Sequence, residues 1–331
     1  MKLEDIGFYT LENTRAMQTS STSPLWRCEL ILTSKCNFSC PYCRGTSKDA
    51  NITFNQAKNI VNKWCDNGLK NIRFSGGEPT MVRWLPELIE YTNNKKSIER
   101  IAISTNGSKP LDYYQKLFTL GVNDFSISLD GCCSAYIDKM SGRNGYFDTI
   151  KNNIMELSKI TYVTVGCVFN KNNVDMFLDT ICFADSLGVS DIRIVSSAQH
   201  NKMIETLAKI PDKIKNKYPI LKYRINNYIK QKNVRGIKKS DCHKCYLMLD
   251  DMAIKGENHY PCIIKMREGC APIGKINNDF RNERLEYFKN TNTFKDKICR
   301  ENCLDVCIDY NNIADYYHTT TDMRLTNARP N

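Results

Sequence analysis

The sequence lacks any long hydrophobic run, and it lacks a secretory signal. No apolar stretch approaches the roughly 20 residues that a membrane-spanning helix needs, and the first residues, MKLEDIGFYT, include acidic positions and no apolar core. The 331 residues are 41% hydrophobic and 25% charged, as in ordinary globular proteins. We therefore expect a cytoplasmic protein without a membrane partner.

Acidic residues are fewer than basic ones, 36 against 47, which gives a net charge of +11. Such an excess occurs in proteins that bind nucleic acid or another acidic partner. Here the lysines are spread along the whole chain, and only residues 230–239 are locally dense. A solvated linker explains that stretch better than a phosphate-binding strip, so the charge alone does not favour a nucleic-acid partner.

Cysteine, by contrast, is abundant, with sixteen residues. In a reducing compartment this indicates metal ligation or catalysis rather than disulfides. Nine cysteines form three groups, Cys36, Cys40 and Cys43, then Cys242, Cys245 and Cys262, then Cys299, Cys303 and Cys307. Four others lie in predicted strands or helices and are expected to be small buried hydrophobes: Cys28, Cys65, Cys167 and Cys182.

From Trp26 to about Val195, short β-rich segments alternate with segments of helical period. This alternation is typical of βα units around a parallel sheet. The six predicted strands are Arg27–Thr33, Asn71–Ser75, Arg100–Ser104, Asn123–Leu129, Tyr162–Val168 and Asp191–Val195. A capping box of Thr53 and Gln56 begins the clearest helix, and Gly68 ends it. Functional groups are expected at the carboxyl ends of the strands, where the βα loops converge.

The expected organisation has three parts: an N-terminal extension of residues 1–23, a barrel of residues 24–239, and a cysteine-rich region of residues 240–331. The boundary is placed near Ser240, because the chain beyond it is punctuated by cysteines and has little periodicity. That region is too short for a large core, so metal binding would replace missing hydrophobic stabilisation.

Three cysteines follow directly on the first strand, in SKCNFSCPYCRG, with the spacing C-x3-C-x2-C. Thiolates this close together can face a common iron–sulfur cluster. A four-iron cluster with only three protein ligands would leave one iron open for substrate, as catalytic zinc sites keep one position free. Zinc is the alternative, although structural zinc sites normally use four ligands.

The loop from Cys36 to Cys43, with Tyr42 before its third cysteine, resembles the signature of the radical SAM superfamily. The segment Ser75–Pro79 at the end of the second strand resembles the GGEP motif of that family. Thr105-Asn106-Gly107 ends the third strand, and Ser126–Gly131 ends the fourth. The resemblance covers about Trp26 to Val195 and implies an α/β fold, a partial (β/α)6 TIM-like barrel, followed here by a small C-terminal Fe–S domain.

The resemblance implies a [4Fe–4S] cluster on Cys36, Cys40 and Cys43 whose open iron binds S-adenosylmethionine. One-electron reduction would cleave that cofactor to methionine and a 5′-deoxyadenosyl radical, which abstracts a substrate hydrogen. A flavodoxin- or ferredoxin-type protein is the expected electron donor. In the family, the GGEP motif receives the methionine amino group, and polar residues at the next strand ends contact the ribose. The expected cofactor contacts are Tyr42, Gly76, Gly77, Glu78, Pro79, Asn106, Ser128 and Asp130.

Some of these residues also have purely structural interpretations. Gly76 and Gly77 could form only a turn, Glu78 and Pro79 a helix start, and Asp130 a helix cap. Arg143 is a further candidate, for the cofactor carboxylate, with an ordinary surface arginine as the alternative.

The six tail cysteines resemble the SPASM and twitch extensions of radical SAM enzymes, which carry auxiliary [4Fe–4S] clusters. The last group is C-x3-C-x3-C and no cysteine follows Cys307, so one auxiliary cluster is expected rather than two. The spacing Cys242-x2-Cys245-x16-Cys262 is also similar to the auxiliary site of the molybdopterin-biosynthesis member. Which of the six bind iron stays open, and a zinc site with His243 or His259 is an alternative.

Cys270 lies outside the three groups and is a candidate donor of a hydrogen atom to a product radical. Cys132 and Cys133 are weaker candidates for the same role. For each of them the alternative is an idle thiol.

The resemblance to SPASM and twitch enzymes suggests modification of a ribosomally made peptide, by a crosslink, a thioether or epimerisation. No leader-binding extra domain is expected, because Met1 to Ser23 is too short to fold alone. A radical SAM enzyme acting on a small molecule or nucleotide is the alternative within enzymes. From another class, an Fe–S or zinc-stabilised nucleic-acid-binding protein without catalysis also stays open.

Overall fold

The computed structural model describes residues 14–45, 51–196, 207–232 and 234–327. More than half of the predicted N-terminal extension, residues 1–13, lies outside the described residues, as do the last four residues of the predicted tail. No helix within the described ranges is both long enough and apolar enough to cross a membrane.

A nine-stranded sheet forms the centre of the molecule, with the order β6-β5-β4-β3-β2-β1-β7-β8-β9. The first seven strands of the chain pair with one another in parallel, and β8 and β9 are added in antiparallel pairs. Their bounds are β1 (Arg27–Thr33), β2 (Asn71–Gly76), β3 (Arg100–Thr105), β4 (Asp124–Ser128), β5 (Tyr162–Phe169), β6 (Asp191–Ser196), β7 (Asp251–Lys255), β8 (Asn258–Tyr260) and β9 (Gly274–Lys275). The six predicted strands are confirmed to within one residue at either end.

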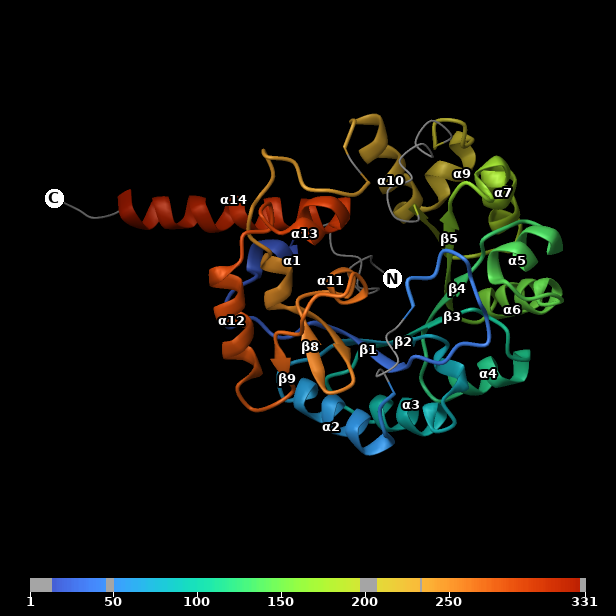
Figure 1. Cartoon of the computed structure of the whole chain (residues 1–331), viewed down its shortest axis with the longest axis horizontal. Helices are drawn as coiled ribbons and strands as arrows, with labels where there is room; N and C mark the ends of the chain where they lie inside the picture. Colours follow the sequence, from blue (N-terminus) through green and yellow to red (C-terminus); the bar gives the residue numbers. More distant parts are fainter. Residues whose placement is uncertain (1–13, 46–50, 197–206, 233, 328–331) are drawn as a thin grey trace.

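Helices form an outer arc around β1 to β6, and the strands lie inside it (Figure 1). These helices are α2 (Phe54–Cys65), α3 (Leu85–Asn93), α4 (Leu111–Thr119), α5 (Ser134–Ser141), α6 (Phe147–Ser158) and α7 (Phe177–Ser186), followed by α9 (Asp212–Lys217) and α10 (Pro219–Ile229). The predicted capping box at the start of α2 is present: the Thr53 side chain accepts from the Gln56 N–H, and the Gln56 side chain accepts from the Thr53 N–H. The parallel sheet with an outer helical layer confirms the predicted α/β fold.

Alternate residues of each strand point to opposite sides of the sheet. Those facing the helices are apolar and belong to one large core, for example Leu30, Phe74 and Phe125. Those facing the inside of the partial barrel are mostly polar or charged, for example Arg73 and Asp124. Because TIM-type barrels normally fill their interior with branched apolar side chains, this charged interior indicates a site rather than a core.

The tail is more regular than its sequence suggests. It contains β7 to β9 and the helices α11 (Ile263–Arg267), α12 (Phe280–Asn290), α13 (Lys297–Asn302) and α14 (Asp305–Asn327). Strand β7 pairs with β1 in parallel, with Arg27 opposite Asp251, so the sheet continues across the boundary predicted near Ser240. The sequence did not indicate β7, because its short apolar run is followed by polar residues.

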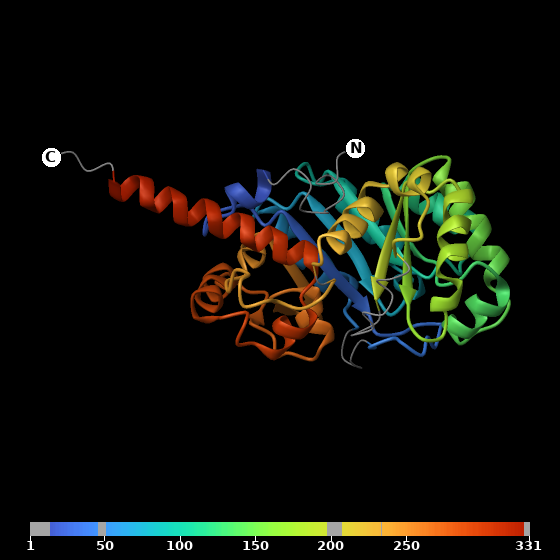
Figure 2. The same ribbon diagram turned by 90° about the horizontal axis from the view of Figure 1, so that it is seen from above.

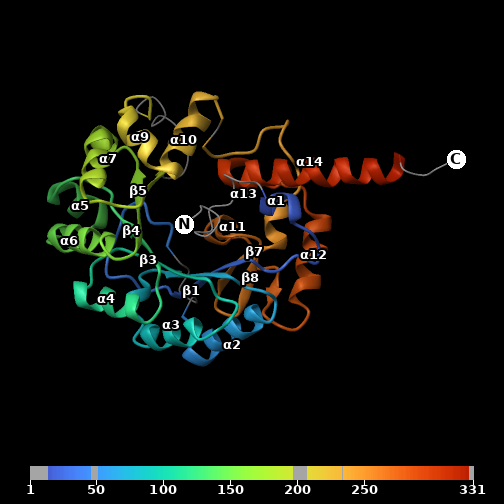
Figure 3. The same cartoon turned by 180° about the vertical axis from the view of Figure 1, so that it is seen from behind.

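The N-terminal helix α1 (Thr14–Gln18) packs on the tail rather than on the barrel. Ala16 is buried against Tyr310 and Ala314 of α14, and Arg15 forms an ion pair with Asp250 at 3.0 Å. Seen from behind, α1, α12 and α14 gather on one side of the molecule, opposite α4 to α7 (Figure 3). The far half of α14 projects beyond the rest of the molecule (Figure 2).

Among the four cysteines predicted to be buried, Cys28 and Cys167 are buried and Cys65 is half-buried. The prediction is wrong for Cys182, which is exposed. Cys182 lies on the amphipathic helix α7, one residue beyond the buried Ile181, so it has turned away from the sheet.

Candidate functional site

The three cysteines of the first group lie on the loop that follows β1. They line a cavity of about 770 Å³ at the carboxyl ends of the strands. The other predicted residues that line it are Tyr42, Gly76, Gly77, Glu78, Asn106, Ser128 and Asp130. The fold therefore brings together residues from the ends of four successive strands.

Gly76 and Gly77 hold the loop after β2 against the loop that carries the cysteines. The Gly77 N–H donates to the Thr33 carbonyl, and the Glu78 N–H donates to the Lys35 carbonyl, both at 2.8 Å. A Cβ atom on Gly77 would lie 2.3 Å from the Lys35 carbonyl oxygen, and Gly76 has φ +154°, a conformation that favours glycine. Only glycine therefore fits at either position. The backbone that Gly77 approaches, at Lys35, lies one residue before Cys36.

The Glu78 carboxylate is buried and fully hydrogen-bonded. Its Oε1 atom accepts from the Thr80 N–H at 3.1 Å and from the Thr105 hydroxyl at 2.8 Å, and its Oε2 atom accepts from the Asn106 N–H at 2.7 Å. Burial raises its pKa and the hydrogen bonds lower it, with burial the larger effect. Glu78 therefore ties the end of β2 to the end of β3 and fixes the wall of the cavity.

Tyr42 and Asp130 are joined across the cavity. The Tyr42 hydroxyl donates to Asp130 Oδ2, and the Val168 N–H donates to Asp130 Oδ1 at 2.7 Å. Burial raises the pKa of Asp130 to about 6. The helix-cap interpretation is not supported, because the Asp130 side chain accepts from β5 and from the cysteine loop.

Asn106 also contacts the cysteine loop, since its amide donates to Asn37 Oδ1 at 2.8 Å. Pro79 is buried at the start of the short 3-10 helix Pro79–Met81 and is not among the residues that line the cavity. Arg143 is not among them either; it is exposed and donates to the Asn37 carbonyl at 3.2 Å. Arg143 thus contacts the cysteine loop but lies outside the cavity.

Three arginines that sequence reasoning missed line the cavity, Arg44, Arg235 and Arg267. Arg235 and Arg267 come from beyond the barrel strands. In addition, Arg44 of the cysteine loop forms an ion pair with Glu268, next to Arg267. No motif marks these residues, because their position depends on how the tail folds back over the mouth of the barrel.

The first cysteine group fits a metal cluster chemically. Burial raises the pKa of Cys36, and it raises the pKa of Cys40 to about 12; in both cases the neighbouring cysteines add to the rise. Positive charge beside these thiols would favour their ionised form, and the iron ions of a cluster would supply it. In the described ranges, no three His, Cys, Asp or Glu side chains converge as ligands of a single metal ion.

In the tail, the cysteines influence one another electrostatically, and Cys245 acts on Cys242, Cys262, Cys299 and Cys303. Burial, and then the charge of Cys245 and its neighbours, raises the pKa of Cys262 and Cys299. A hydrogen bond with Cys307 is the main cause of the raised pKa of Cys303. Burial raises the pKa of Cys242, and Asp315 and Cys245 add to the rise. The fold thus brings cysteines of both tail groups close enough to affect one another's pKa.

Cys270 lies away from the main cavity. It packs on a small cluster with Ile31, Tyr260 and Met266 and is not among the residues that line the cavity. Cys132 and Cys133 are half-buried just beyond β4 and do not line it either. None of the three thiols therefore faces the space where the cofactor is expected.

Below the main cavity, the barrel interior holds a second cavity of about 230 Å³. Ser104 and Arg267 line both cavities, and Cys262 and Cys307 line the second. Arg193 projects into it, with Nε buried and without a hydrogen-bond partner. Burial, followed by the charge of Arg73, lowers the pKa of Arg193 to about 10. The interior therefore connects the first cysteine group with the tail cysteines and carries a buried cation.

Comparison with known proteins defines the class. Residues 30–184 match the model of the radical SAM superfamily. This match covers the cysteine loop and the strand-end motifs, and the predicted resemblance to the superfamily is confirmed.

Curated relatives include the GTP 3′,8-cyclases of Tolumonas auensis, 28% identical over 180 residues, and of Staphylococcus carnosus, 30% identical over 190 residues. The matches cover 53% and 54% of this chain, and 54% and 51% of the relatives. The chain therefore spans about half the length of the curated relatives it matches.

Among solved structures, Streptococcus suis SuiB bound to the precursor peptide SuiA is similar with a TM-score of 0.60 at 14% identity, over 87% of this chain and 71% of that one. The structure of anSMEcpe with bound AdoMet is similar with a TM-score of 0.59 at 14% identity, over 92% of this chain and 100% of that one. The likeness of fold thus extends into the cysteine-rich tail, and the predicted resemblance to radical SAM enzymes with such a tail is confirmed.

Proposed function

We propose that this protein reductively cleaves S-adenosylmethionine and uses the resulting 5′-deoxyadenosyl radical to modify a ribosomally made peptide. The observation that carries the proposal is the cavity of about 770 Å³ in which Cys36, Cys40 and Cys43 face the ends of four strands. Cleavage of S-adenosylmethionine would be common to the superfamily. The reaction of the radical depends on which substrate binds in the barrel.

The residues of the cavity suit the cofactor. The three cysteines would hold a [4Fe–4S] cluster, which supplies the electron and an open iron for the amino and carboxylate groups of S-adenosylmethionine. Gly77 and Glu78 would position the methionine end, because their backbone is fixed by hydrogen bonds to Thr33 and Lys35. Asp130 and Ser128, on the other wall, would contact the ribose.

A peptide substrate is supported by the likeness of fold to SuiB bound to its precursor peptide and to anSMEcpe with bound peptide. We further propose that five tail cysteines, Cys245, Cys262, Cys299, Cys303 and Cys307, include the ligands of one auxiliary [4Fe–4S] cluster. Two of them line the inner cavity, so substrate bound there would lie between the two clusters.

The decisive experiment is a cleavage assay. Protein reconstituted anaerobically with iron and sulfide, reduced with dithionite and given S-adenosylmethionine should yield 5′-deoxyadenosine and methionine. A Cys40→Ala variant serves as the control and should yield neither. Intact cluster absorption without 5′-deoxyadenosine would contradict the proposal and would favour a protein without catalysis.

A small anionic substrate is the second candidate, and Arg193 favours it. In the described part of the chain, no carboxylate lies within ion-pair distance of this buried guanidinium, and a buried cation normally has a partner. The relatives that act as GTP 3′,8-cyclases point the same way. An increase in S-adenosylmethionine turnover when GTP is added would support this candidate over a peptide, provided that the increase is lost in Arg193→Gln.

A further inference from the structure

We propose that the cleft between α10 and α14 is the docking site of the electron donor, an acidic flavodoxin-type protein that delivers electrons through the tail cysteines. This inference rests on the proposed function. It concerns a surface outside both cavities described above.

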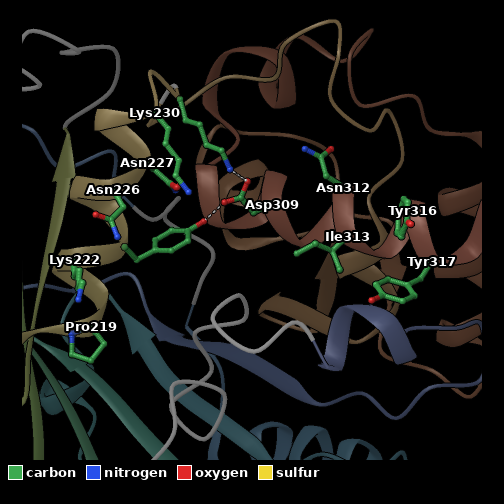
Figure 4. Close-up of a pocket in the computed structure, with 12 residues that line it drawn as sticks. Pro219, Lys222, Asn226, Asn227, Lys230, Asp309, Asn312, Ile313, Tyr316 and Tyr317 are labelled. Carbon is green, nitrogen blue, oxygen red and sulfur yellow. Dashed lines mark hydrogen bonds and ion pairs between the residues drawn. The ribbon is translucent and has the colours of Figure 1, made fainter.

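The cleft has a volume of about 720 Å³ and is bounded by one face of each helix. Lys222 and Asn226 of α10, and Lys230 directly after its last residue, are spaced four residues apart and share a face. Across from them, Asp309, Asn312, Ile313, Tyr316 and Tyr317 follow one face of α14 (Figure 4).

Side-chain contacts hold α10 and α14, the two walls of the cleft, against each other. Arg224 of α10 forms a buried ion pair with Asp305 of α14 at 2.6 Å, and the Asn227 amide donates to the same carboxylate at 3.0 Å. Lys232 and Tyr223 both bind Asp309. Four side-chain contacts thus fix the cleft, which is therefore preorganised for a partner.

The lining of the cleft carries more positive than negative charge, with Lys222, Lys230 and Lys232 against Asp309. Residues 209–239 contain nine lysines and two arginines but one acidic residue, Asp212. The only carboxylate among the residues that line the cleft, Asp309, is already bound to Lys232. Lys222 and Lys230 are exposed and have no ion-pair partner within the part of the chain that the structure describes. A partner with an acidic rim would supply the missing charge.

The outer end of the cleft is aromatic. Two tyrosines of α14 line it there, Tyr316, which is 63% exposed, and Tyr317, which is 40% exposed. Large exposed apolar side chains beside a charged surface are typical of protein interfaces. Exposed tyrosines beside lysines would suit a partner that presents a planar flavin edge surrounded by carboxylates better than they would suit a small ion.

The cleft adjoins the tail cysteines. Asp309 lies two residues after Cys307 on α14, and Asn312, which lines the cleft, accepts from the Cys242 N–H at 2.6 Å. A smaller cavity of about 190 Å³ shares Lys232, Asp309 and Asn312 with the cleft and reaches Asp241. A carrier seated here would be oxidised by one electron while an auxiliary cluster on the tail cysteines is reduced by one.

The test compares the double variant Lys222→Glu/Lys230→Glu with Lys96→Glu/Lys116→Glu, a matched pair of exposed lysines near α3 and α4. Binding of oxidised flavodoxin to the reconstituted holoenzyme is measured by calorimetry at low and high salt. We expect affinity to fall at least tenfold in the first variant, the wild-type affinity to fall with salt, and the control pair to stay near wild type.

A second measurement separates docking from chemistry. With flavodoxin as reductant, 5′-deoxyadenosine formation should fall at least tenfold in Lys222→Glu/Lys230→Glu, while with dithionite it should equal that of the wild type. Unchanged flavodoxin affinity in that variant, or an equal loss in the control pair, would overturn the proposal. So would binding of a ferredoxin where flavodoxin does not bind. Absence of product with dithionite in the wild type would instead overturn the proposed function, and the binding data would still decide the docking site.

Discussion

The Glu78 carboxylate accepts a hydrogen bond from the backbone N–H of Asn106 at 2.7 Å, which joins the loops after β2 and β3. The other carboxylate oxygen accepts from the Thr80 N–H. An amide in place of the carboxylate would point its NH2 group at one of these two backbone donors in either orientation. The geometry therefore requires the ionised acid.

From this follows the first prediction, for Glu78→Gln. We expect the free energy of unfolding to fall by about 1 to 3 kcal/mol, the cost of an unsatisfied buried donor, and S-adenosylmethionine binding to weaken about tenfold. Urea unfolding and anaerobic equilibrium dialysis measure the two effects. Glu90→Gln, on the exposed side of α3, is the matched control. Equal stability of the two variants would contradict the interpretation of Glu78 as a tie between strands.

The second prediction concerns iron content. We expect about eight irons per chain after reconstitution, from two four-iron clusters, and about four when Cys36, Cys40 and Cys43 are all replaced by alanine. Colorimetric iron and sulfide analysis gives the numbers. About four irons in the wild type would show that the tail holds no cluster, and about twelve would show that it holds two.

The third prediction concerns Arg284, which organises the tail from the buried side of α12. Its guanidinium donates to the Met248 and Asp251 carbonyls at 2.6 Å and to the Tyr260 carbonyl at 2.9 Å. Arg284→Met would leave these buried carbonyls without a donor, so we expect a loss of more than about 3 kcal/mol in stability.

Because Arg284 holds together the segments that carry Cys245 and Cys262, the Arg284→Met variant should also lose the tail cluster. Iron analysis should then give about four irons per chain, with S-adenosylmethionine binding retained. Arg281→Met, on the same helix, is the control. It donates to the Ser23 carbonyl at 2.6 Å, so its replacement should cost less stability and no iron. Full iron content in Arg284→Met would refute the assigned role.

The fourth prediction is a pH dependence of stability that arises from Asp191. This carboxylate accepts from the Ile220 N–H at 2.9 Å at the start of α10, and burial raises its pKa to about 6. A raised carboxyl pKa means that the folded state binds the proton more tightly than the unfolded state. The contribution of Asp191 to stability therefore increases as pH falls from 7 to 5, by about 1 kcal/mol.

Urea unfolding of the wild type and of Asp191→Asn between pH 7 and pH 5 isolates this effect. The difference in free energy of unfolding should change in favour of the wild type as the pH is lowered, because the amide that replaces the carboxylate in the variant does not titrate. A difference that is constant with pH, or that changes in the opposite direction, would rule out the assigned cause.

The barrel could be predicted from the sequence because its signals are local. Each strand is a short apolar run bounded by turn residues, and the Thr53 capping box marks a helix start by itself. The wall of the main cavity could be predicted for the same reason, since the motifs with Gly77, Asn106 and Asp130 each end a strand. Carboxyl ends of parallel strands meet at one edge whatever the rest of the chain does.

The tail could not be predicted in this way, because long-range contacts decide its structure. Strand β7 forms because its neighbour β1, from the other end of the chain, already exists. Arg235 and Arg267 reach the cavity only when the tail has folded over it. The cleft beside α14 likewise depends on the pairing of Arg224 with Asp305, which no local pattern indicates.

The pairing of β7 with β1 has a consequence for handling the protein. In a barrel of six strands, β1 is an open edge, and an open edge offers unpaired N–H and C=O groups to other chains. Here β7 covers that edge along five residues, from Arg27 to Ile31. A fragment that stops before residue 240 would expose it and is expected to aggregate, so the two halves have to be produced as one polypeptide.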